Sequence, residues 1–346
     1  MVLDCEFQMK QSAAYAGFPA IQQYKISLRL KGAYGEAPAG TVMEVFMERK
    51  LDKRGELMHT LALLVCAAIW GSAFVAQSVG AEYVGAFTFL AIRNWIAVAF
   101  LIPVILIRDT ILKKSGRTDV RPANRTQRRF LLMGGAACGF FLCSASAFQQ
   151  IGIAYTTTAK AGFITALYVV IVPILAMFFG KKVKNRIWIC VALAVVGLYL
   201  LCMRGELSLS FGDGVVLVCA FLFACQIMTV DYFAPLVDTV RLSQTQFFVT
   251  ALLSTVCMFF FERPGSDTII MALPSIAYAG VMSSGVAYTL QIIGQQNLNP
   301  AIASITMSLE SVFAALAGWL VLGQSMTFRE LVGCVLMFAA IILAQL

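Results

Sequence analysis

Long apolar runs dominate the chain from residue 58 onward, and short polar segments separate them. Crossing the hydrocarbon core of a bilayer takes about 20 mostly apolar residues in a helix. The pattern therefore predicts an all-α integral membrane protein with ten transmembrane helices. The predicted spans are 58–79, 86–107, 130–153, 160–179, 187–203, 213–233, 243–262, 272–294, 300–322 and 328–345.

The apolar pattern of about 58–203 recurs in about 213–345. The quartet Leu64-Val65-Cys66-Ala67 returns 153 positions later, at Leu217-Val218-Cys219-Ala220. Later matches share an offset of 142, and the difference corresponds to the longer loop 108–129. These matches pair Gln149, Gly152, Ala159, Ala161, Leu167 and Val170 with Gln291, Gly294, Ala301, Ala303, Leu309 and Val312.

Each copy of the pattern holds five spans. Because five is odd, the second copy must enter the membrane from the opposite side, which predicts two inverted five-helix repeats. This architecture is typical of secondary transporters, whose substrate site lies near the midplane between the repeats. The copies differ where charge occurs, since Arg93 aligns with Gln246 and Glu310 aligns with Tyr168.

Composition agrees with a protein embedded in the lipid bilayer. Hydrophobic residues make up 60% of the chain and charged residues 13%, against about 45–50% and about 25% in soluble domains. The net charge of +8 raises the alternative of a nucleic-acid partner. We expect none, because the positive residues are confined to a few short segments, as in cytoplasmic loops.

Lysine and arginine in short loops predict the orientation. The loop 108–129 carries eight of them, the loop after the fourth span four, and the leader before the first span four. All these lysines and arginines lie on the cytoplasmic side of the membrane if both termini are cytoplasmic. We expect this membrane to be the plasma membrane. The inside loops of the second copy add only Arg241.

Residues 1–56 are predicted to form an N-terminal cytoplasmic extension. Residues 1–46 hold no sustained apolar run, and we interpret them as disordered or as a mis-assigned start before Met47. The two repeats then occupy 57–206 and 207–346.

Residues for enzyme chemistry are sparse. Eight of the ten cysteines lie in apolar runs, and the chain has no CxxC pair and a single histidine, His59. We therefore expect no metal, no cofactor and no enzymatic activity. His59 is interpreted as a solvated residue at a helix entrance.

Glu310 is the deepest charged residue, ten positions into the ninth span. A charge at such a depth costs about 2.5–3.5 kcal/mol on insertion scales and marks a functional site by default. Ile305, Leu309, Val312 and Leu316 form a bulky stripe expected to face lipid, which turns Glu310 inward among small residues. A substrate or proton role and a structural hydrogen bond are equally weighted alternatives.

Five further residues are candidates for substrate binding or coupling. Arg93 would balance Glu310 or attract an anionic substrate, and its alternative is a structural or snorkelling arginine. Lys160 is also open to snorkelling. Gln149 and Gln291 would line a pathway or join helices by hydrogen bonds, and Trp70 stands beside a glycine in mid-span.

Glycine and serine mark two spans as tightly packed and able to kink. They are Gly134-Gly135 in the third span and Gly280 with Ser283-Ser284-Gly285 in the eighth.

Several segments together resemble the EamA-type, ten-helix members of the drug/metabolite transporter superfamily over about residues 57–346. They are Ala68-Ile69-Trp70-Gly71-Ser72-Ala73-Phe74, Arg93-Asn94-Trp95, Thr157-Thr158-Ala159-Lys160-Ala161-Gly162-Phe163 with Pro173, and Ser308-Leu309-Glu310-Ser311 with Leu322-Gly323. The chain departs from the family pattern at Ser311, where a proline is frequent, and at Gln324, where an acid is frequent.

The resemblance implies an alternating-access carrier, often an exporter of metabolites, amino acids or drug-like compounds. Its cavity would be framed by helices 1–4 and 6–9, with helices 5 and 10 peripheral. Glu310, Arg93 and Lys160 would supply polar contacts, and protons are a candidate coupling ion through Glu310. A membrane sensor or assembly component on the same scaffold is the alternative function. Both a monomer and a homodimer stay open.

Overall fold

The computed structural model describes residues 53–114, 125–153, 155–156, 158–203, 210–296, 298–322 and 327–345. Helices account for every regular element in these residues, and ten helical stretches are long and apolar enough to cross a membrane. The predicted all-α fold with ten spans is therefore confirmed. Residues 1–46, for which disorder was predicted, lie outside the described residues, as do residues 47–52.

The first five spans are built from six helices. These are α4 (Lys53–Ala81), α5 (Ala86–Lys114), α6 (Arg125–Ile153), α7 (Thr158–Ala166), α8 (Tyr168–Phe178) and α9 (Asn185–Cys202). The last five spans comprise α10 (Phe211–Phe233), η1 (Ala234–Leu236), α11 (Thr239–Phe261), α12 (Ser266–Tyr278), η2 (Ala279–Ala287), α13 (Tyr288–Gln295), α14 (Pro300–Met307), α15 (Glu310–Leu322) and α16 (Phe328–Gln345).

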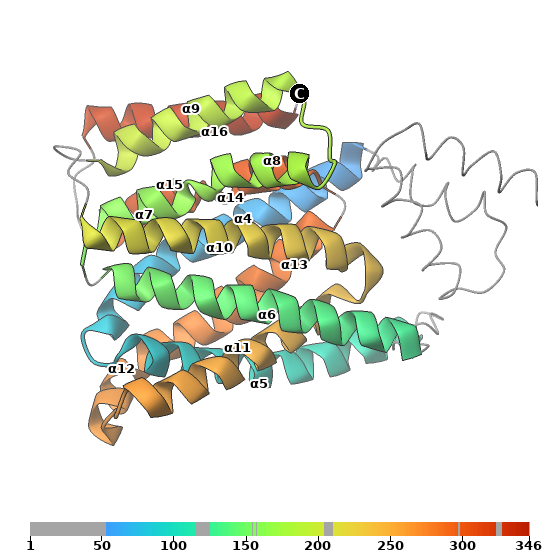
Figure 1. Cartoon of the computed structure of the whole chain (residues 1–346), viewed down its shortest axis with the longest axis vertical. Helices are drawn as coiled ribbons and strands as arrows, with labels where there is room; N and C mark the ends of the chain where they lie inside the picture. Colours follow the sequence, from blue (N-terminus) through green and yellow to red (C-terminus); the bar gives the residue numbers. More distant parts are fainter. Residues whose placement is uncertain are drawn as a thin grey trace, which may run out of the picture.

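The contacts between helices follow the predicted inverted repeat. The second and seventh spans pack together as α5 and α11, and the fifth and tenth as α9 and α16. The first span, α4, packs against α13 and α15, whereas its counterpart α10 packs against α6 and α8. In Figure 1, α4 begins at the right of the bundle and α10 begins at the left. The two repeats therefore run in opposite directions and exchange equivalent contacts.

The fourth and ninth spans are each broken in two. Leu167 separates α7 from α8, and Ser308 and Leu309 separate α14 from α15, whereas the apolar pattern had predicted continuous helices. At the second break the Ser308 hydroxyl donates to the carbonyl of Ile305 at 2.8 Å, a side-chain bond that bends helices. Leu167 and Leu309 are equivalent positions of the two repeats, so the breaks are equivalent too.

The eighth span contains the π-helical segment η2 between α12 and α13. A Cβ atom on Gly280 would lie 2.8 Å from the carbonyl oxygen of Arg93, and one on Gly285 would lie 2.6 Å from the ring of Phe100. Only glycine allows α5 to approach η2 this closely. The predicted close packing of this span is thus present in the structure.

One prediction about the ninth span is wrong. Ile305, Leu309 and Val312 were expected to face lipid, but their side chains are at most 1% exposed and pack in one cluster with α9 and α16. Figure 1 shows α9 and α16 side by side along this edge of the bundle. The bulky apolar stripe gave the wrong orientation because apolar side chains are favoured equally against a neighbouring apolar helix and against lipid tails.

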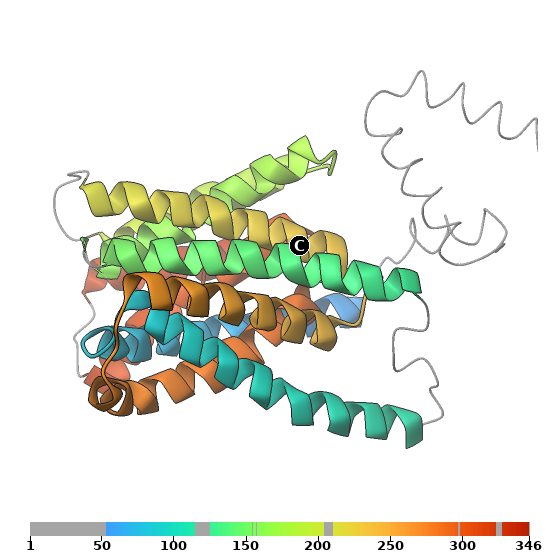
Figure 2. The same ribbon diagram turned by 60° about the horizontal axis from the view of Figure 1, so that its bottom comes forward.

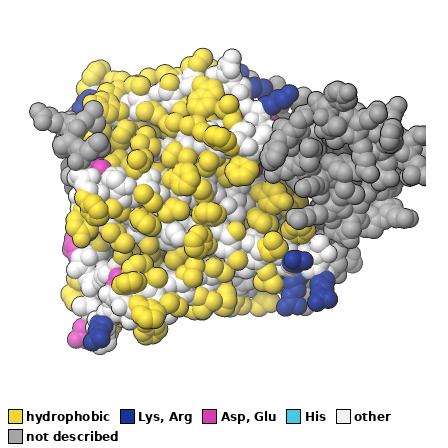
Figure 3. All heavy atoms as spheres, in the orientation of Figure 1, with side chains coloured by type: hydrophobic (Ala, Val, Ile, Leu, Met, Phe, Trp, Pro, Cys, Tyr) yellow, Lys and Arg dark blue, Asp and Glu magenta, His cyan; other side chains and the backbone are white. Residues whose placement is uncertain are grey.

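The outer surface is suited to a bilayer. Figure 3 shows apolar side chains over most of one flank, while the Lys and Arg side chains in this view gather mainly at the end where α4 begins. Figure 2 shows that the helices run along a common direction between the two ends. The flanks therefore face lipid and the ends face water.

Candidate functional site

A cavity lies between the two repeats, next to both helix breaks. Its lining combines aromatic and apolar side chains with amides, hydroxyls and two charges. The lining residues are Trp70, Phe74, Gln77, Arg93, Gln149, Thr165, Tyr168, Phe223, Gln226, Ile227, Ser283, Tyr288, Gln291, Met307 and Glu310.

Ten of these fifteen residues form pairs of equivalent positions in the two repeats. At the offset of 153 the pairs are Trp70 with Phe223 and Phe74 with Ile227; at the offset of 142 they are Gln149 with Gln291, Thr165 with Met307, and Tyr168 with Glu310. The cavity therefore lies at the pseudo-twofold axis that relates the two repeats. Helices α9 and α16 contribute no lining residue, in line with the peripheral place expected for helices 5 and 10.

Glu310 and Tyr168 are the first residues of the two half-helices α15 and α8. Both are buried, and the Tyr168 hydroxyl donates to Oε1 of Glu310 at 3.2 Å. A carboxylate at a helix N-terminus is stabilised by the helix dipole. The break in the ninth span thus holds an acidic group inside the cavity.

Arg93 reaches the same cavity from α5 and is 4% exposed. Its Nη1 donates to Oε1 of Gln77 at 3.2 Å, its guanidinium lies 5.9 Å from the centre of the Phe89 ring, and its Nε has no partner. In the part of the chain that the structure describes, no ion pair joins Arg93 to Glu310. The expected balance between these two charges is therefore absent from this conformation.

The candidate amides both line the cavity and join helices. Gln149 donates to Thr165 at 3.3 Å and Gln291 donates to Gln226 at 3.1 Å. Gln226 in turn donates to Gln246 at 3.5 Å. Gln246 belongs to the seventh span, α11, and does not itself line the cavity. Helix α11 therefore lies behind the lining residues, although helices 6–9 were all expected to frame the cavity.

Trp70 lies in an aromatic group at the cavity wall. Its ring centre is 4.6 Å from that of Tyr288, which is 5.7 Å from that of Phe247. The Nε1 atom of Trp70 is buried without a hydrogen-bond partner. The adjacent Gly71 lets α4 meet the α15 backbone, because a Cβ there would lie 2.7 Å from the carbonyl oxygen of Glu310.

Five of the six candidate site residues thus meet at one cavity: Trp70, Arg93, Gln149, Gln291 and Glu310. Lys160 belongs to α7, and its side chain lies outside the described residues, as does Gln324. Sequence reasoning missed Gln77, Gln226 and Tyr288 as lining residues. A glutamine inside an apolar run, as at Gln226, was an available signal.

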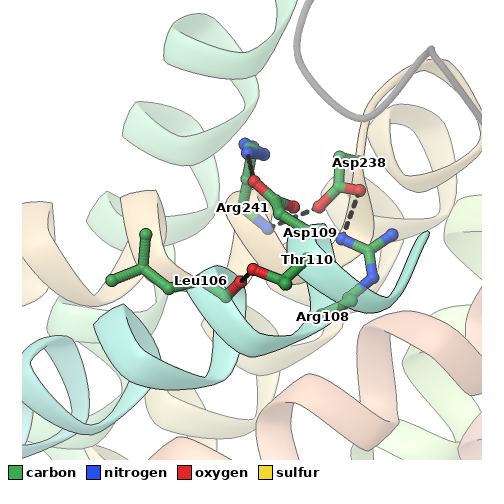
Figure 4. A network of polar contacts seen from close by, with 6 residues as sticks. All are labelled: Leu106, Arg108, Asp109, Thr110, Asp238 and Arg241. Atoms are coloured by element: carbon green, nitrogen blue, oxygen red, sulfur yellow. Dashed lines mark hydrogen bonds and ion pairs between the residues drawn. The ribbon is translucent and has the colours of Figure 1, made fainter. Parts of the chain in front are cut away.

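Ion pairs connect the repeats away from the cavity. Arg241 of α11 contacts Asp109 of α5 at 2.5 Å, and Arg108 of α5 contacts Asp238, which caps α11, at 2.6 Å. Figure 4 shows these four side chains facing one another where α5 ends and α11 begins. At the opposite end, Glu262 accepts hydrogen bonds from the backbone N–H groups of Phe87 and Thr88. The α5–α11 pair is therefore tied at both ends.

Two further polar contacts lie away from the cavity. Asp231 forms an ion pair with Lys181. His59, expected to be solvated, is half-buried and its Nδ1 donates to the carbonyl of Ile293 at 2.7 Å.

The ten spans, the inverted repeats and the cavity between them define a helical membrane protein with the architecture of a transporter. Residues 57–203 and 210–346 each match the EamA-like transporter family, and the chain belongs to this family. A protein of Archaeoglobus fulgidus described as an uncharacterized transporter is 29% identical over 295 residues, which cover 84% of this chain and 86% of that protein. A solved crystal structure with a TM-score of 0.66 covers 83% of this chain and 96% of the other at 18% identity, and it supports the fold alone.

Proposed function

We propose that this EamA-family transporter is a secondary active carrier that exports small metabolites or drug-like compounds by alternating access. The observation that carries the proposal is the cavity at the two equivalent helix breaks, lined by equivalent residues of both repeats. Discontinuous helices at corresponding positions of two inverted repeats are the usual construction of a transport site. The export direction rests on the family resemblance.

Inverted repeats can adopt two related conformations, one open to each side of the membrane. If each repeat adopts the shape that its counterpart has now, the access route moves to the opposite side of the membrane. The α5–α11 and α9–α16 pairs join equivalent spans of the two repeats. The half-helices α8 and α15 pivot at Leu167 and at Ser308-Leu309, where the regular helix is already interrupted.

The proposed substrate contacts are Glu310, Arg93, Gln149, Gln291 and Trp70, with Lys160 at the start of the fourth span. Glu310 is also the proposed site at which a proton is taken up and released during transport. A buried carboxylate costs several kcal/mol when nothing neutralises it. Coupling follows because the conformations expose this group to opposite sides of the membrane.

We further propose a plasma-membrane location with both termini in the cytoplasm. At the end of the bundle where α4 begins, α5 and α8 end and α6 begins. The chain next to these helix ends carries Arg108, Lys113, Lys114, Arg128 and Lys182, and cytoplasmic ends are rich in lysine and arginine. Residues 1–56 would be a cytoplasmic extension, followed by repeats at 57–206 and 207–346.

Reconstitution into liposomes tests the function. The liposomes are loaded with a cellular metabolite extract, a pH difference is imposed, and released solutes are identified by mass spectrometry. At least one solute is expected to leave faster than from protein-free liposomes, at a rate that depends on the pH difference. Glu310→Gln is expected to abolish that dependence, while the exposed control Glu82→Gln retains it. Protein that moves no solute in either direction favours a sensor or assembly role.

A further inference from the structure

Two equivalent contacts join α5 and α11, one at each end of the helix pair. Glu262, directly after α11, accepts a hydrogen bond from the backbone N–H of Thr88 at 2.8 Å and another from the Thr88 hydroxyl at 2.6 Å. At the other end, Asp109 of α5 contacts Arg241 at 2.5 Å (Figure 4). Thr88 and Arg241 are the third residues of α5 and α11. At the repeat offset of 153 both the acids and their partners are aligned pairs, so each of these end contacts is the counterpart of the other.

The local sequence makes Glu262 the cap of a helix in the other repeat. Helix α11 has its own N-cap, because the Asp238 side chain accepts a hydrogen bond from the N–H of Arg241 at 2.9 Å. The equivalent position, directly before α5, is Gly85, and a Cβ atom there would lie 2.3 Å from Cδ of Glu262. The Glu262 carboxylate therefore takes the place of a capping side chain, and α5 depends on the opposite repeat for it.

Contacts between α5 and α11 continue along the space between the two ends. The Nε1 atom of Trp95 donates to the Thr255 hydroxyl at 3.0 Å, and its ring centre lies 5.7 Å from that of Phe248. Further along, Leu101 and Phe247 are buried in one apolar cluster. The two helices are therefore joined over their length.

A symmetric pair of helices keeps its arrangement when two inverted repeats exchange conformations. In the proposed alternating access, each repeat adopts the shape of its counterpart. This exchange places each end contact where the other was and leaves the backbones of α5 and α11 as they are. The third and eighth spans differ in shape, because α6 is continuous whereas η2 interrupts its counterpart, so these spans change.

A gate between α5 and α11 is the less favourable arrangement. Opening one end would separate Asp109 from Arg241, whose side chains are only 10% and 13% exposed. Opening the other end would remove the acceptor that Glu262 gives to the first turn of α5. Separating charges in a largely buried setting is costly, which favours movement at other contacts.

We propose that Glu262 and Asp109 are positioning residues for transport, and that their end contacts keep α5 and α11 joined throughout the transport cycle. Helix α5 carries Arg93 to the cavity five residues after Thr88. Arg93 therefore keeps its depth while the half-helices α8 and α15 move, and the access route opens beside the α5–α11 pair. The inference rests on the proposed function and specifies which part of the fold stays fixed.

Reversible cross-linking of the full chain in liposomes tests whether α5 and α11 stay joined. One variant carries Thr88→Cys and Glu262→Cys, and another carries Asp109→Cys and Arg241→Cys. Both are treated with the shortest bis-methanethiosulfonate linker. The probe is the solute that wild type releases from extract-loaded liposomes, and treated wild type corrects for the native cysteines. Cross-linking should leave the release rate of each variant unchanged.

A third cross-link joins spans that are expected to move against each other. The hydroxyls of Ser72 on α4 and Tyr278 on α12 are 2.6 Å apart, and Tyr278 directly precedes η2. Ser72→Cys with Tyr278→Cys, treated with the same linker, should stop solute release. Reduction of the linker should restore it.

Moving the helix cap separates a positioning role from a purely structural one and needs no cysteine. Glu262→Ala removes the α5 cap together with the contact between repeats. Adding Gly85→Asp returns a cap from the same repeat, as Asp238 provides for α11. Thermal unfolding of the double variant should return to that of wild type, whereas its release rate should stay about tenfold lower, the factor for one hydrogen bond to a charged group. Glu82→Ala, at an exposed acid, should change neither.

Two results overturn the inference. The first is loss of release on cross-linking either end contact, restored by reduction, which makes the α5–α11 contact a gate. The second is full transport by the double variant with Gly85→Asp and Glu262→Ala, which makes Glu262 a helix cap only. Wild type that releases no solute removes the proposed function itself, a result distinct from both.

Discussion

Tyr168 and Glu310 occupy equivalent positions of the two repeats, and the Tyr168 hydroxyl donates to the Glu310 carboxylate at 3.2 Å. Positions related by a twofold axis meet only where that axis passes between them. The pair therefore locates the pseudo-twofold axis of the fold at the cavity. The axis relates the backbones of the two repeats but not their side chains, because Tyr168 supplies a phenol where Glu310 supplies a carboxylate.

This contact predicts the effect of Tyr168→Phe. The substitution keeps the ring and removes the hydroxyl, so Glu310 loses its donor in a buried setting. Side-chain hydrogen bonds between membrane helices are worth about 0.6 kcal/mol on average and up to about 1.7 kcal/mol, and we expect a loss of this order in unfolding free energy. Thermal unfolding in detergent measures it. Tyr155→Phe, at an exposed tyrosine, should be neutral, and equal stability of the two variants would contradict the contact.

The close approach of α4 to α15 predicts opposite effects at two glycines. At Gly71 a Cβ would lie 2.6 Å from the backbone nitrogen of Ala314, whereas at Gly214 nothing lies within 4 Å. Both are helical, where alanine is favoured over glycine by about 0.5–1 kcal/mol. Gly214→Ala should therefore stabilise the protein slightly, and Gly71→Ala should destabilise it by about 1–3 kcal/mol.

Transport by Gly71→Ala should also fall, because the backbone displaced by the new methyl group is that of Glu310. The two alanine variants are compared by unfolding in detergent and by solute release from liposomes. A stabilised and fully active Gly71→Ala variant would show that α4 and α15 do not pack as described.

The ion pair between Asp109 and Arg241 is expected to stabilise the α5–α11 contact. Its side chains are 10% and 13% exposed, so the pair is more buried than surface pairs worth about 0–1 kcal/mol. Asp109→Asn should cost about 1–3 kcal/mol, since it removes the negative charge that faces the Arg241 guanidinium in a largely buried pair.

A double-mutant cycle with Arg241→Gln isolates the pairwise contribution. Unfolding free energies of the two single variants and the double variant are compared with wild type, and the double variant should lose less than the sum of the singles. Simple additivity would mean that the two side chains do not interact. Lys182→Gln, at an exposed lysine, is the control for loss of a positive charge.

The burial of the ninth-span stripe predicts different costs for two leucines. Leu309 is fully buried against α9 and α16, while Leu132 on α6 is 54% exposed. Leu309→Ala should destabilise the protein by about 2–5 kcal/mol, the range for cavity-forming core substitutions. Leu132→Ala should cost far less, because lipid fills the space. The reverse order in an unfolding assay would restore the lipid-facing interpretation of the stripe.

The candidate residues show how far the sequence reaches at the site. Glu310 and Arg93 stood out because a charge within an apolar run is costly, a property that needs no structure. Gln77 and Tyr288 did not stand out, since an amide or a phenol in a span is compatible with many positions. Their part in the cavity follows from the helices that surround them.

By itself, the sequence determined the ten spans, the duplication and the opposite direction of the two repeats. These follow from the length and periodicity of apolar runs, which the thickness of a bilayer constrains directly. Only the tertiary structure decided that the fourth and ninth spans break at equivalent leucines, that Ile305 and Leu309 face helices instead of lipid, and that Tyr168 meets Glu310. These features depend on which helix covers which face. A packed helix and lipid both favour apolar side chains, so the sequence pattern does not distinguish them.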